Sequence, residues 1–544
     1  MPRHSRHASS TPGREATATD DIPRSGQWWA PALALAAILI FVAVVRLGVA
    51  ATPLERDEGE YAYVGQLILQ GTPPYQAAYN MKFPGTYYAY AGILAVFGET
   101  PAGIREGLLL VNAATIVLVF LVGRRALGTR SAIVAAWVFA LLSMSPRILG
   151  LFAHATHFVL LPLMAALWIV VDRAPTTWRR ALAAGVLAGL AVLMKQHAVV
   201  FVPCLAAFVL WRDWRSSGTG LSRVTSTGLV LAGAAAPFAV VCAVLALQGA
   251  FGAFWFWTIA YARAYVSVVP LSEAPAQFMA GWRLVTQSSL PLWAGGGVGL
   301  VLLWAGRWPA ETRVWLTGLA VASFAALTPG FYFREHYFIL LLPSVALLTG
   351  VAVETMSRWG SRVIPRWLAG GVAVALVGGC SAVLIVGQRA TLFAASPDDV
   401  SRAVYQSPHF VEAREVARFV RENTAPDDRI AVLGSEPEIY FYADRRAATG
   451  YIYTYALMEP QPYAARMQDE MIRQVETAHP KYVVAVLDQS AWLIRNTSER
   501  RILAWIPRYL DTCYDGIEVP GLSASTNVFQ LYRWKNDHAC RAGS

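Results

Sequence analysis

The stretch "WAPALALAAILIFVAVVRLGVAATPLERDEGEYAY" (residues 29–63) joins a long apolar run to a cluster of charged side chains. The run from Trp29 to Ala50 is long enough to cross the hydrocarbon core of a bilayer as a helix. The charged residues that follow it are Glu55, Arg56, Asp57, Glu58 and Glu60. The stretch therefore predicts a transmembrane helix with a carboxylate cluster directly after it.

The composition of the chain is that of a membrane protein. Of its 544 residues, 56% are hydrophobic and 15% are charged, whereas soluble proteins carry about 25% charged residues. The apolar residues form blocks of roughly 16 to 24 residues, the length that spans a bilayer. The net charge of +10 does not indicate nucleic-acid binding, because the basic residues lie in short loops between these blocks.

The apolar blocks predict a polytopic α-helical membrane protein with about 11 to 13 transmembrane helices within residues 29–389. The basic loops orient these helices, since Lys and Arg collect on the cytoplasmic side. The loops are 123–130, 172–180, 211–218, 306–313 and 357–366. The first outer loop, 51–86, then faces away from the cytoplasm. Residues 1–28 are polar and are predicted to be a disordered cytosolic tail.

Residues 390–544 contain no spanning block and are predicted to form an extracytoplasmic α/β domain. Short β-like runs occur at 429–434, 481–487 and 527–534, with helical patterns at 409–423 and 461–478. Cys513 and Cys540 could form a disulfide if the domain lies outside the cytoplasm, but their spacing does not establish the pair. The chain has no Walker motif, which argues against an ATP-driven pump.

The charged stretch continues into "LERDEGEYAYVGQLILQG" (54–71), which has a helical pattern. In a helix, Asp57 and Tyr61 share one face. Such a helix is expected to lie along the outer membrane surface, where amphipathic aromatic side chains are favoured. Its interfacial residues would be Tyr61, Tyr63, Leu67 and Leu69. The simpler alternative is a solvated cap on the first transmembrane helix, but the following aromatic loop also holds an isolated basic residue, Lys82.

The motif "RDEGEYAYVGQLILQG" (56–71), followed by a Lys-x-Pro element in "KFPGTYY" (82–88), resembles the first outer loop of GT-C glycosyltransferases. The match is best with the protein O-mannosyltransferase-like superfamily, which includes bacterial aminoarabinose and lipopolysaccharide-core sugar transferases. The segments 189–204, 333–350 and 416–453 resemble further parts of that superfamily.

The resemblance implies a membrane enzyme that takes a monosaccharide from a polyprenyl-phosphate carrier. The sugar would pass to an extracytoplasmic lipid, glycan or protein acceptor with inversion at the anomeric carbon. Asp57 matches the catalytic acid of the superfamily and is expected to act as general base toward the acceptor hydroxyl. Glu58 would orient Asp57 or bind the sugar. The implied location is a bacterial-type inner membrane, with membrane lipids and no nucleic acid as partners.

Basic residues in outward-facing segments are candidates for holding the donor phosphate, because cations stabilise it electrostatically. These candidates are Lys82, Lys195, Arg263, Arg334 and His336, with Tyr61 as a further substrate contact. Structural alternatives exist for each basic residue. Lys82 could anchor and Lys195 could snorkel at the membrane surface. Arg334 and His336 could belong to a loop ion pair, and Arg263 to an interfacial aromatic helix.

The chain departs from the superfamily at the second outer acid, which many relatives carry after a Ser-Pro element. In "SPRILGLFAHATHFVLLP" (145–162), His157 lies near that place, with His154 one turn earlier. His157 could pair with Asp57, contact phosphate, or be a satisfied polar group between helices. A zinc site made by the two histidines lacks an obvious further ligand. No cofactor is expected, although the sequence leaves a divalent metal open.

Other functions compete with a transferase. A transporter or flippase for lipid-linked sugars is the main alternative, but the chain lacks an internal repeat and its charges cluster in outer loops. A glycan polymerase or ligase with a diphosphate donor is the second, but the Trp-Trp-Asp element of oligosaccharyltransferases is absent. A sugar-binding scaffold without activity is the third.

Overall fold

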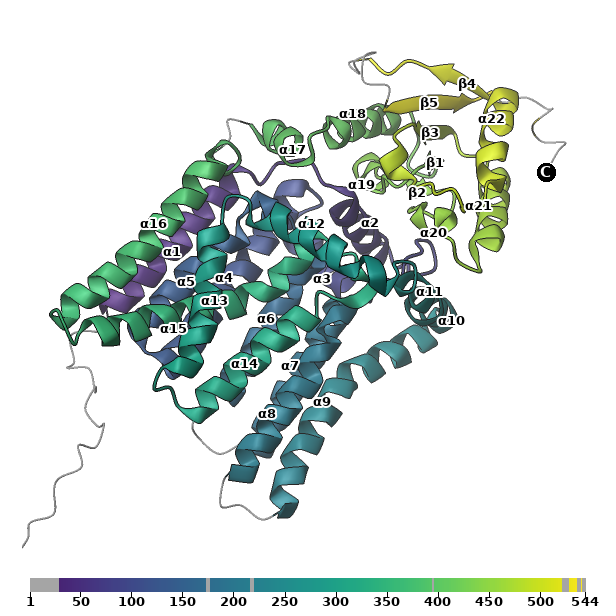
Figure 1. Cartoon of the computed structure of the whole chain (residues 1–544). Helices are drawn as coiled ribbons and strands as arrows, with labels where there is room; N and C mark the ends of the chain where they lie inside the picture. Colours follow the sequence, from purple (N-terminus) through teal and green to yellow (C-terminus); the bar gives the residue numbers. More distant parts are fainter. Residues whose placement is uncertain are drawn as a thin grey trace, which may run out of the picture.

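A computed structural model describes residues 29–172, 177–215, 220–393, 396–520, 528–535 and 540. The predicted tail, 1–28, lies outside these residues. Helices dominate up to residue 392 (Figure 1). They are α1 (Trp29–Gly48), α2 (Arg56–Leu69), α3 (Gly85–Phe97), α4 (Pro101–Leu127), α5 (Thr129–Ser143), α6 (Ala155–Val170), α7 (Trp178–Met194), α8 (Phe201–Arg215), α9 (Gly220–Leu247), α10 (Phe251–Trp255), α11 (Ala262–Val266), α12 (Ala274–Thr286), α13 (Leu290–Ala305), α14 (Ala310–Ala325), α15 (Leu342–Gly360) and α16 (Arg366–Leu392).

The described part of the chain contains six helices that are long and apolar enough to cross a membrane, or seven if one bent pair is a single span. The six are Trp29–Gly48, Pro101–Leu127, Gln196–Arg215, Val224–Leu247, Glu335–Gly360 and Arg366–Leu392. The bent pair, Leu271–Thr286 and Leu290–Ala305, turns by 114°. The expectation of about 11 to 13 spans is not reached by these criteria, because apolar helices such as α5 and α6 are shorter than 18 residues.

The charged stretch forms α2 as predicted, but its surroundings differ from the prediction. Tyr61, Tyr63 and Leu67 are at most 3% exposed, so the expected position at the membrane interface is wrong for them. The helix packs against α3 on one side and against the C-terminal domain on the other. Leu69, at the end of α2, is 44% exposed. Tertiary packing thus replaces the lipid interface as the environment of these side chains.

The C-terminal domain is an α/β domain that lies at one end of the helical bundle (Figure 1). Its helices are α17 (Pro397–Tyr405), α18 (His409–Glu422), α19 (Glu438–Ala443), α20 (Tyr455–Met458), α21 (Ala464–Ala478) and α22 (Arg501–Cys513). Its strands are β1 (Arg429–Leu433), β2 (Arg446–Ala447), β3 (Tyr482–Val486), β4 (Tyr514–Ile517) and β5 (Phe529–Trp534). The three predicted strand regions correspond to β1, β3 and β5, and the two helical patterns to α18 and α21.

The sheet of this domain has the strand order β2-β1-β3-β5-β4. Strand β1 runs parallel to β2 and β3, whereas β5 runs antiparallel to β3 and β4. All five residues of β3 are buried, as expected for a central strand that is covered on both faces. The sheet is therefore mixed. Strands β2, β1 and β3 form its parallel part, and β5 and β4 add its antiparallel part.

The domain and the first outer loop share one hydrophobic core. Tyr61 and Tyr87 of the outer loop and α3 belong to the same buried cluster as Ile430 and Val483 of the sheet. At Gly59, a Cβ atom would lie 2.5 Å from the Cβ atom of Glu438, so only glycine permits the close approach of α2 to α19. The domain is thus packed firmly onto α2.

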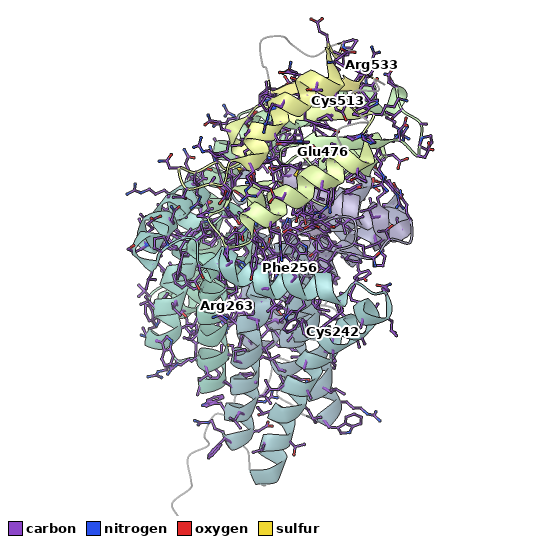
Figure 2. All side chains as sticks on the ribbon, turned by 90° about the vertical axis from the view of Figure 1, so that its right-hand side faces the viewer. Cys242, Phe256, Arg263, Glu476, Cys513 and Arg533 are labelled. Atoms are coloured by element: carbon purple, nitrogen blue, oxygen red, sulfur yellow. A yellow bond between two sulfur atoms is a disulfide. The ribbon has the colours of Figure 1, made fainter. Side chains whose placement is uncertain are left out.

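Cys513 and Cys540 form a disulfide in the structure, which decides between the alternatives left open by the sequence. Cys513 lies in the C-terminal domain, far from Cys242 on the bundle helix α9 (Figure 2). Cys204, Cys242 and Cys380 are free.

We expect a thiol titration of the denatured, unreduced protein to detect three of the five cysteines, and all five after reduction. Cys513→Ser should lower the free energy of unfolding of the domain by about 3 kcal/mol, because a crosslink restricts the unfolded chain. Cys380→Ser is the matched control. It should lower the thiol count only by the one thiol that it removes, and it should leave the stability of the domain unchanged. Five reactive thiols without reductant would contradict the pairing.

Candidate functional site

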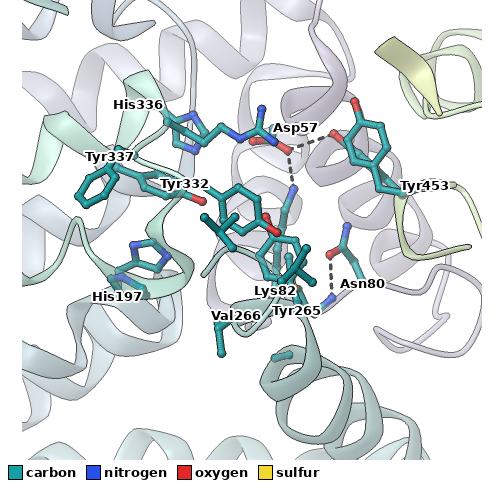
Figure 3. Close-up of a pocket in the computed structure, with 18 of the residues that line it drawn as sticks. Asp57, Asn80, Lys82, His197, Tyr265, Val266, Tyr332, His336, Tyr337 and Tyr453 are labelled. Atoms are coloured by element: carbon teal, nitrogen blue, oxygen red, sulfur yellow. Dashed lines mark hydrogen bonds and ion pairs between the residues drawn. The ribbon is translucent and has the colours of Figure 1, made fainter. Parts of the chain in front are cut away.

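A cavity of about 890 Å³ lies between the C-terminal domain and the adjoining end of the bundle. Its walls come from the start of α2, the loop before α3, the turn before α6, the junction of α7 and α8, the segment around α11 and α12, the segment before α15, and the C-terminal domain. This volume is in the range of small-molecule sites. Figure 3 shows a close-up of the cavity, with Asp57 on its wall between His336 and Tyr453 in this view.

Helix α2 places its first carboxylates at the cavity by ordinary helix-capping chemistry. The side chain of Glu55 caps the helix by accepting a hydrogen bond of 2.9 Å from the Glu58 backbone N–H. Acidic residues in the first turn are also favoured by the helix dipole. Glu55, Arg56 and Asp57 all line the cavity, so the capping turn itself forms part of the wall.

Asp57 and Lys82 form an ion pair at the cavity wall. The Lys82 Nζ atom lies 2.7 Å from Asp57 Oδ1 and 2.6 Å from Glu60 Oε2. The Tyr453 hydroxyl donates a hydrogen bond of 3.1 Å to the same Asp57 oxygen, and Lys82 also lies 4.4 Å from the centre of the Tyr61 ring. Burial favours the neutral carboxyl, but Lys82 and then His154 outweigh it and hold the pKa of Asp57 well below its usual value. Asp57 is therefore ionised at neutral pH.

The cavity brings together most of the predicted site residues. Asp57, Tyr61, Lys82, Lys195, Arg334 and His336 all line it. Lys195 ends α7, 4.6 Å from the centre of the Tyr337 ring. Among the residues that the structure describes, neither Lys195 nor Arg334 forms an ion pair with a carboxylate. The cavity therefore carries positive charge that is not committed within the protein.

Glu58 is a correction to the prediction, because it does not line the cavity. Its carboxylate is fully buried and lies 2.6 Å from the Arg105 guanidinium. It also accepts a hydrogen bond of 2.7 Å from the Ala153 backbone N–H. These contacts tie α2 to α4 and to the turn before α6. Glu58 supports the start of α2 from the side away from the cavity, and it does not face the cavity.

His157 and Arg263 are further corrections. His157 is 2% exposed and lies within α6, away from the lining of the cavity; its neighbour His154 lines the cavity. Arg263 is exposed on α11 and is absent from the cavity wall. In Figure 2 it lies, with Phe256, on a helical segment below the C-terminal domain. This placement agrees with the alternative of an aromatic helix.

The helix that carries Arg263 still contributes to the site through its aromatic residues. A π-helical turn, Phe256–Tyr261, joins α10 to α11, and such turns are common at functional sites. Trp257 and Tyr261 from this turn line the cavity. The Trp257 ring stacks on Tyr79 with 5.5 Å between ring centres. The wall on this side is therefore aromatic.

The cavity also contains residues that sequence reasoning did not assign to the site, above all Glu55, His154, Tyr453 and Glu459. Burial, and after it repulsion from Asp57, raises the pKa of Glu55 to about 7. Glu55 was visible in the acidic cluster, and its place before the first turn of α2 is a capping signal. Tyr453 and Glu459 come from the C-terminal domain, and no local pattern connects them with Asp57.

The residues most suited to a metal ion are Asp57, His154 and His336. One ligand atom of each lies within 4.8 Å of the others, and the two imidazole rings are stacked 4.4 Å apart. The histidine pair considered from the sequence, His154 and His157, is not the pair that the fold brings together.

Arg56 connects the cavity to the C-terminal domain. Its guanidinium lies 2.7 Å from the buried Glu436 carboxylate, which is also 2.6 Å from His409. The Arg56 side chain further donates hydrogen bonds to Tyr455 and Ser490. Buried charges with several partners hold one arrangement of the two parts, so the C-terminal domain is fixed as one wall of the cavity.

Comparisons with solved structures identify the fold. ArnT from Cupriavidus metallidurans, solved with undecaprenyl phosphate, superposes with a TM-score of 0.59 over 93% of this chain and 98% of that chain, at 17% identity. The chain has a GT-C fold. AglB, the oligosaccharyltransferase of Archaeoglobus fulgidus solved with an inhibitory peptide and a dolichol-phosphate, has a TM-score of 0.52 over 85% of this chain and 70% of that chain, at 13% identity.

Two further matches bear on this GT-C protein. The arabinofuranosyltransferase AftD from Mycobacteria has a TM-score of 0.50 over 94% of this chain and 42% of that chain, at 16% identity. A sequence profile described as dolichyl-phosphate-mannose-protein mannosyltransferase matches residues 81–246. A comparison with curated protein sequences gave no match. The resemblance inferred from the sequence is confirmed at the level of the fold.

Glu459 provides a prediction for the pH dependence of stability. It is 5% exposed and accepts a hydrogen bond from Tyr261, and burial raises its pKa to about 7 from 4.5. Because the folded state favours the protonated carboxyl, the stability that this group contributes is present below pH ~4.5 and is lost as the pH rises through about 7. The loss should be at most about 3 kcal/mol.

We expect the Tm of the wild-type protein to fall between pH 5 and 8 relative to that of Glu459→Gln, which lacks the titrating group. Glu470→Gln, a partly buried glutamate of the same domain, is the control and should keep the wild-type slope. Parallel Tm curves for the wild type and Glu459→Gln would contradict the raised pKa.

Proposed function

We propose that the protein is a membrane glycosyltransferase that moves a monosaccharide from a polyprenyl-phosphate carrier to an extracytoplasmic lipid, glycan or protein acceptor. One observation carries this proposal. An ionised aspartate, Asp57, shares a cavity with two cations, Lys195 and Arg334, that have no carboxylate partner in the described part of the chain. Unpaired cations in a partly enclosed cavity are suited to an anionic ligand such as a lipid phosphate.

The reaction needs a proton acceptor and a site for a leaving phosphate. The acceptor hydroxyl attacks C1 of the sugar, and the bond between C1 and the phosphate oxygen breaks with its electron pair on the phosphate. The hydroxyl proton passes to the Asp57 carboxylate. Lys195 and Arg334 hold the negative charge of the departing polyprenyl phosphate. Attack opposite to the leaving group inverts the configuration at C1.

Lys82 links the two halves of this reaction. In the structure it neutralises Asp57 and Glu60, and this pairing makes Asp57 a weak base. A donor phosphate near Lys82 would share the ammonium charge and so raise the basicity of Asp57. In this scheme donor binding prepares Asp57 to accept the proton, and Lys82 remains a phosphate contact as the sequence suggested.

The expected location is a bacterial-type inner membrane, with the cavity and the C-terminal domain outside the cytoplasm. Two observations support this orientation. Among the described residues, none in the basic loops 123–130, 172–180, 211–218, 306–313 and 357–366 lines the cavity, as expected if these loops are cytoplasmic. The Cys513–Cys540 disulfide is of the kind that persists in oxidising compartments. The known ligands of ArnT and AglB, undecaprenyl phosphate and dolichol-phosphate, agree with a lipid-phosphate carrier.

The proposal is tested by mass spectrometry of envelope glycans, lipids and glycoproteins from cells with and without the gene. We expect one monosaccharide to disappear from one class of acceptor and to return on complementation. An unchanged glycan, lipid and glycoprotein profile, together with transport of a lipid-linked sugar by the purified protein, would favour the flippase alternative.

Lys195→Met should weaken the binding of undecaprenyl phosphate to the purified protein by about tenfold or more, because a cation that contacts phosphate is lost. Arg334→Met should act in the same direction. Binding is measured by native mass spectrometry or by ligand titration in nanodiscs. Lys481→Met is the matched control, since Lys481 lies on the sheet and pairs with Asp428. Equal affinity of all variants for undecaprenyl phosphate would contradict a phosphate site in this cavity.

A further inference from the structure

Arg46 is a buried cation of the helical bundle that has no counter-ion. It lies in the last turn of α1 and is 3% exposed. Among the residues that the structure describes, it forms no ion pair with a carboxylate. The charge that acts on it is that of a second arginine, Arg105, which is itself paired with Glu58. An uncompensated charge inside a bundle of apolar helices is costly, so Arg46 requires a negative partner.

Backbone carbonyl groups supply only part of what Arg46 needs. Its Nη2 atom donates hydrogen bonds of 2.8 Å to the Ser143 carbonyl oxygen and 3.0 Å to that of Gly150. Ser143 ends α5, and Gly150 lies in the turn before α6. His157 also donates a hydrogen bond to the Gly150 carbonyl, so that oxygen is shared. The dipoles of two carbonyl groups and of a helix end offset a fraction of a full charge.

The remaining donors of this region are unused. Within the described part of the chain, Arg46 Nε and Nη1 have no hydrogen-bond partner, and neither has Nδ2 of Asn112 on α4, which is 1% exposed. The Asn112 Oδ1 atom lies 3.5 Å from the Ser143 hydroxyl, so the amide lies beside the residue that binds Arg46. Helices α1, α4 and α5 pack against one another here (Figure 1). Because the unused groups of Arg46 and Asn112 are all N–H donors, they indicate a missing acceptor.

We propose that a monovalent inorganic anion, chloride, binds between Arg46 and Asn112 where α1, α4 and α5 meet. A halide accepts several N–H hydrogen bonds and carries the one negative charge that Arg46 lacks. A water molecule would satisfy the donors but would leave the charge uncompensated. Neither residue lines the large cavity, so the site is separate from the proposed transferase centre and does not depend on that function. The anion would fix Arg46, and through it the turn at Gly150 that leads to His154.

The test measures the Tm of the full-length protein in nanodiscs, with sodium gluconate replaced stepwise by sodium chloride at constant ionic strength. We expect the wild-type Tm to rise with chloride and to saturate, and bromide to act in the same way. Arg46→Met should abolish this rise, because the charge that binds the anion is lost. Asn112→Leu should raise the half-saturating chloride concentration by about tenfold or more, because a donor is lost.

Asn112→Asp tests the charge directly, because it places a carboxylate beside Arg46. We expect its Tm in gluconate to reach at least that of the wild type in chloride, and to change no further when chloride is added. This variant decides the question by itself if Arg46→Met is too unstable to purify. Asn112→Asp with the wild-type response to chloride would contradict the site.

Arg313→Met is the matched control. Arg313 also donates to a carbonyl oxygen at the end of a helix, that of Gly306 after α13, but it is only partly buried, so the response to chloride should persist. Crystals grown in bromide should show anomalous scattering beside the Arg46 guanidinium. Equal wild-type Tm values in gluconate and chloride would overturn the inference. A chloride response that survives in Arg46→Met, or an ordered water at Arg46 without anomalous signal, would also overturn it.

Discussion

Asp57→Asn should reduce sugar transfer by about 10²–10⁴-fold, the usual cost of losing a general base. The amide keeps the shape of the side chain but cannot accept a proton from the acceptor hydroxyl. It also removes one of the two anions that hold Lys82 at the cavity wall. Transfer is measured as restoration of the missing envelope sugar in cells and as turnover by purified protein in nanodiscs.

The interpretation of this variant depends on its fold. The Asp57 side chain is 21% accessible and Lys82 keeps its pair with Glu60 in the variant, so the replacement should lower the Tm less than Glu58→Gln does. Asp444→Asn is a matched control, since Asp444 also contacts α2, through Gln66, but lies away from the cavity. Asp57→Asn with more than about a tenth of wild-type turnover would exclude Asp57 as the base, and Glu55, with its pKa of about 7, would become the candidate.

Glu58→Gln should show the opposite behaviour, with a large loss of stability and a smaller direct effect on transfer. Its carboxylate pairs with Arg105, and both side chains are at most 2% exposed. Removing one charge of a buried pair leaves the other uncompensated, at a cost of about 3–5 kcal/mol. We expect a clearly lower Tm and a lower midpoint of denaturant unfolding.

Glu354→Gln is the control for this effect. Glu354 pairs with Arg358 one turn away on α15, and the Arg358 side chain is half exposed, so its loss should cost less than about 1 kcal/mol. Together, the variants at positions 57 and 58 distinguish a residue needed for proton transfer from a residue needed for the stability of the fold. A Glu58→Gln protein with wild-type stability and no sugar transfer would indicate that Glu58 acts directly in the reaction.

The contrast between Asp57 and Glu58 was only partly predictable. Successive residues on a helix point about 100° apart, so the sequence already indicates that the two carboxylates face different surroundings. The direction of each depends on what packs around α2. Arg105, which forms the ion pair with Glu58, lies on α4. In the sequence it is an isolated charged residue near the start of an apolar block.

The histidines illustrate the same limit. His154 and His157 are one turn apart in sequence, yet His154 lines the cavity and His157 is buried within the protein. The difference follows from the start of α6, where His154 is the residue before the first helical turn. Its stacking partner, His336, comes from a segment far along the chain. No local pattern joins the two.

The sequence by itself determined the features that depend on local periodicity and composition. These are the membrane class, the helix that begins at Arg56, and the strands of the C-terminal domain at 429–433 and 482–486. Each follows from hydrophobic spacing within one segment. The sequence also placed Asp57 among the catalytic candidates through its resemblance to GT-C proteins.

Only the tertiary structure decided which side chains meet at the site. It packed the C-terminal domain onto α2, buried Tyr61 and Tyr63, and brought Tyr453 to Asp57. It also left Arg263 outside the cavity. The physical reason is that contacts between distant segments depend on how buried faces fit together and on which charges can be neutralised there. Those conditions are met only in the assembled fold, and they cannot be inferred from any single stretch of the chain.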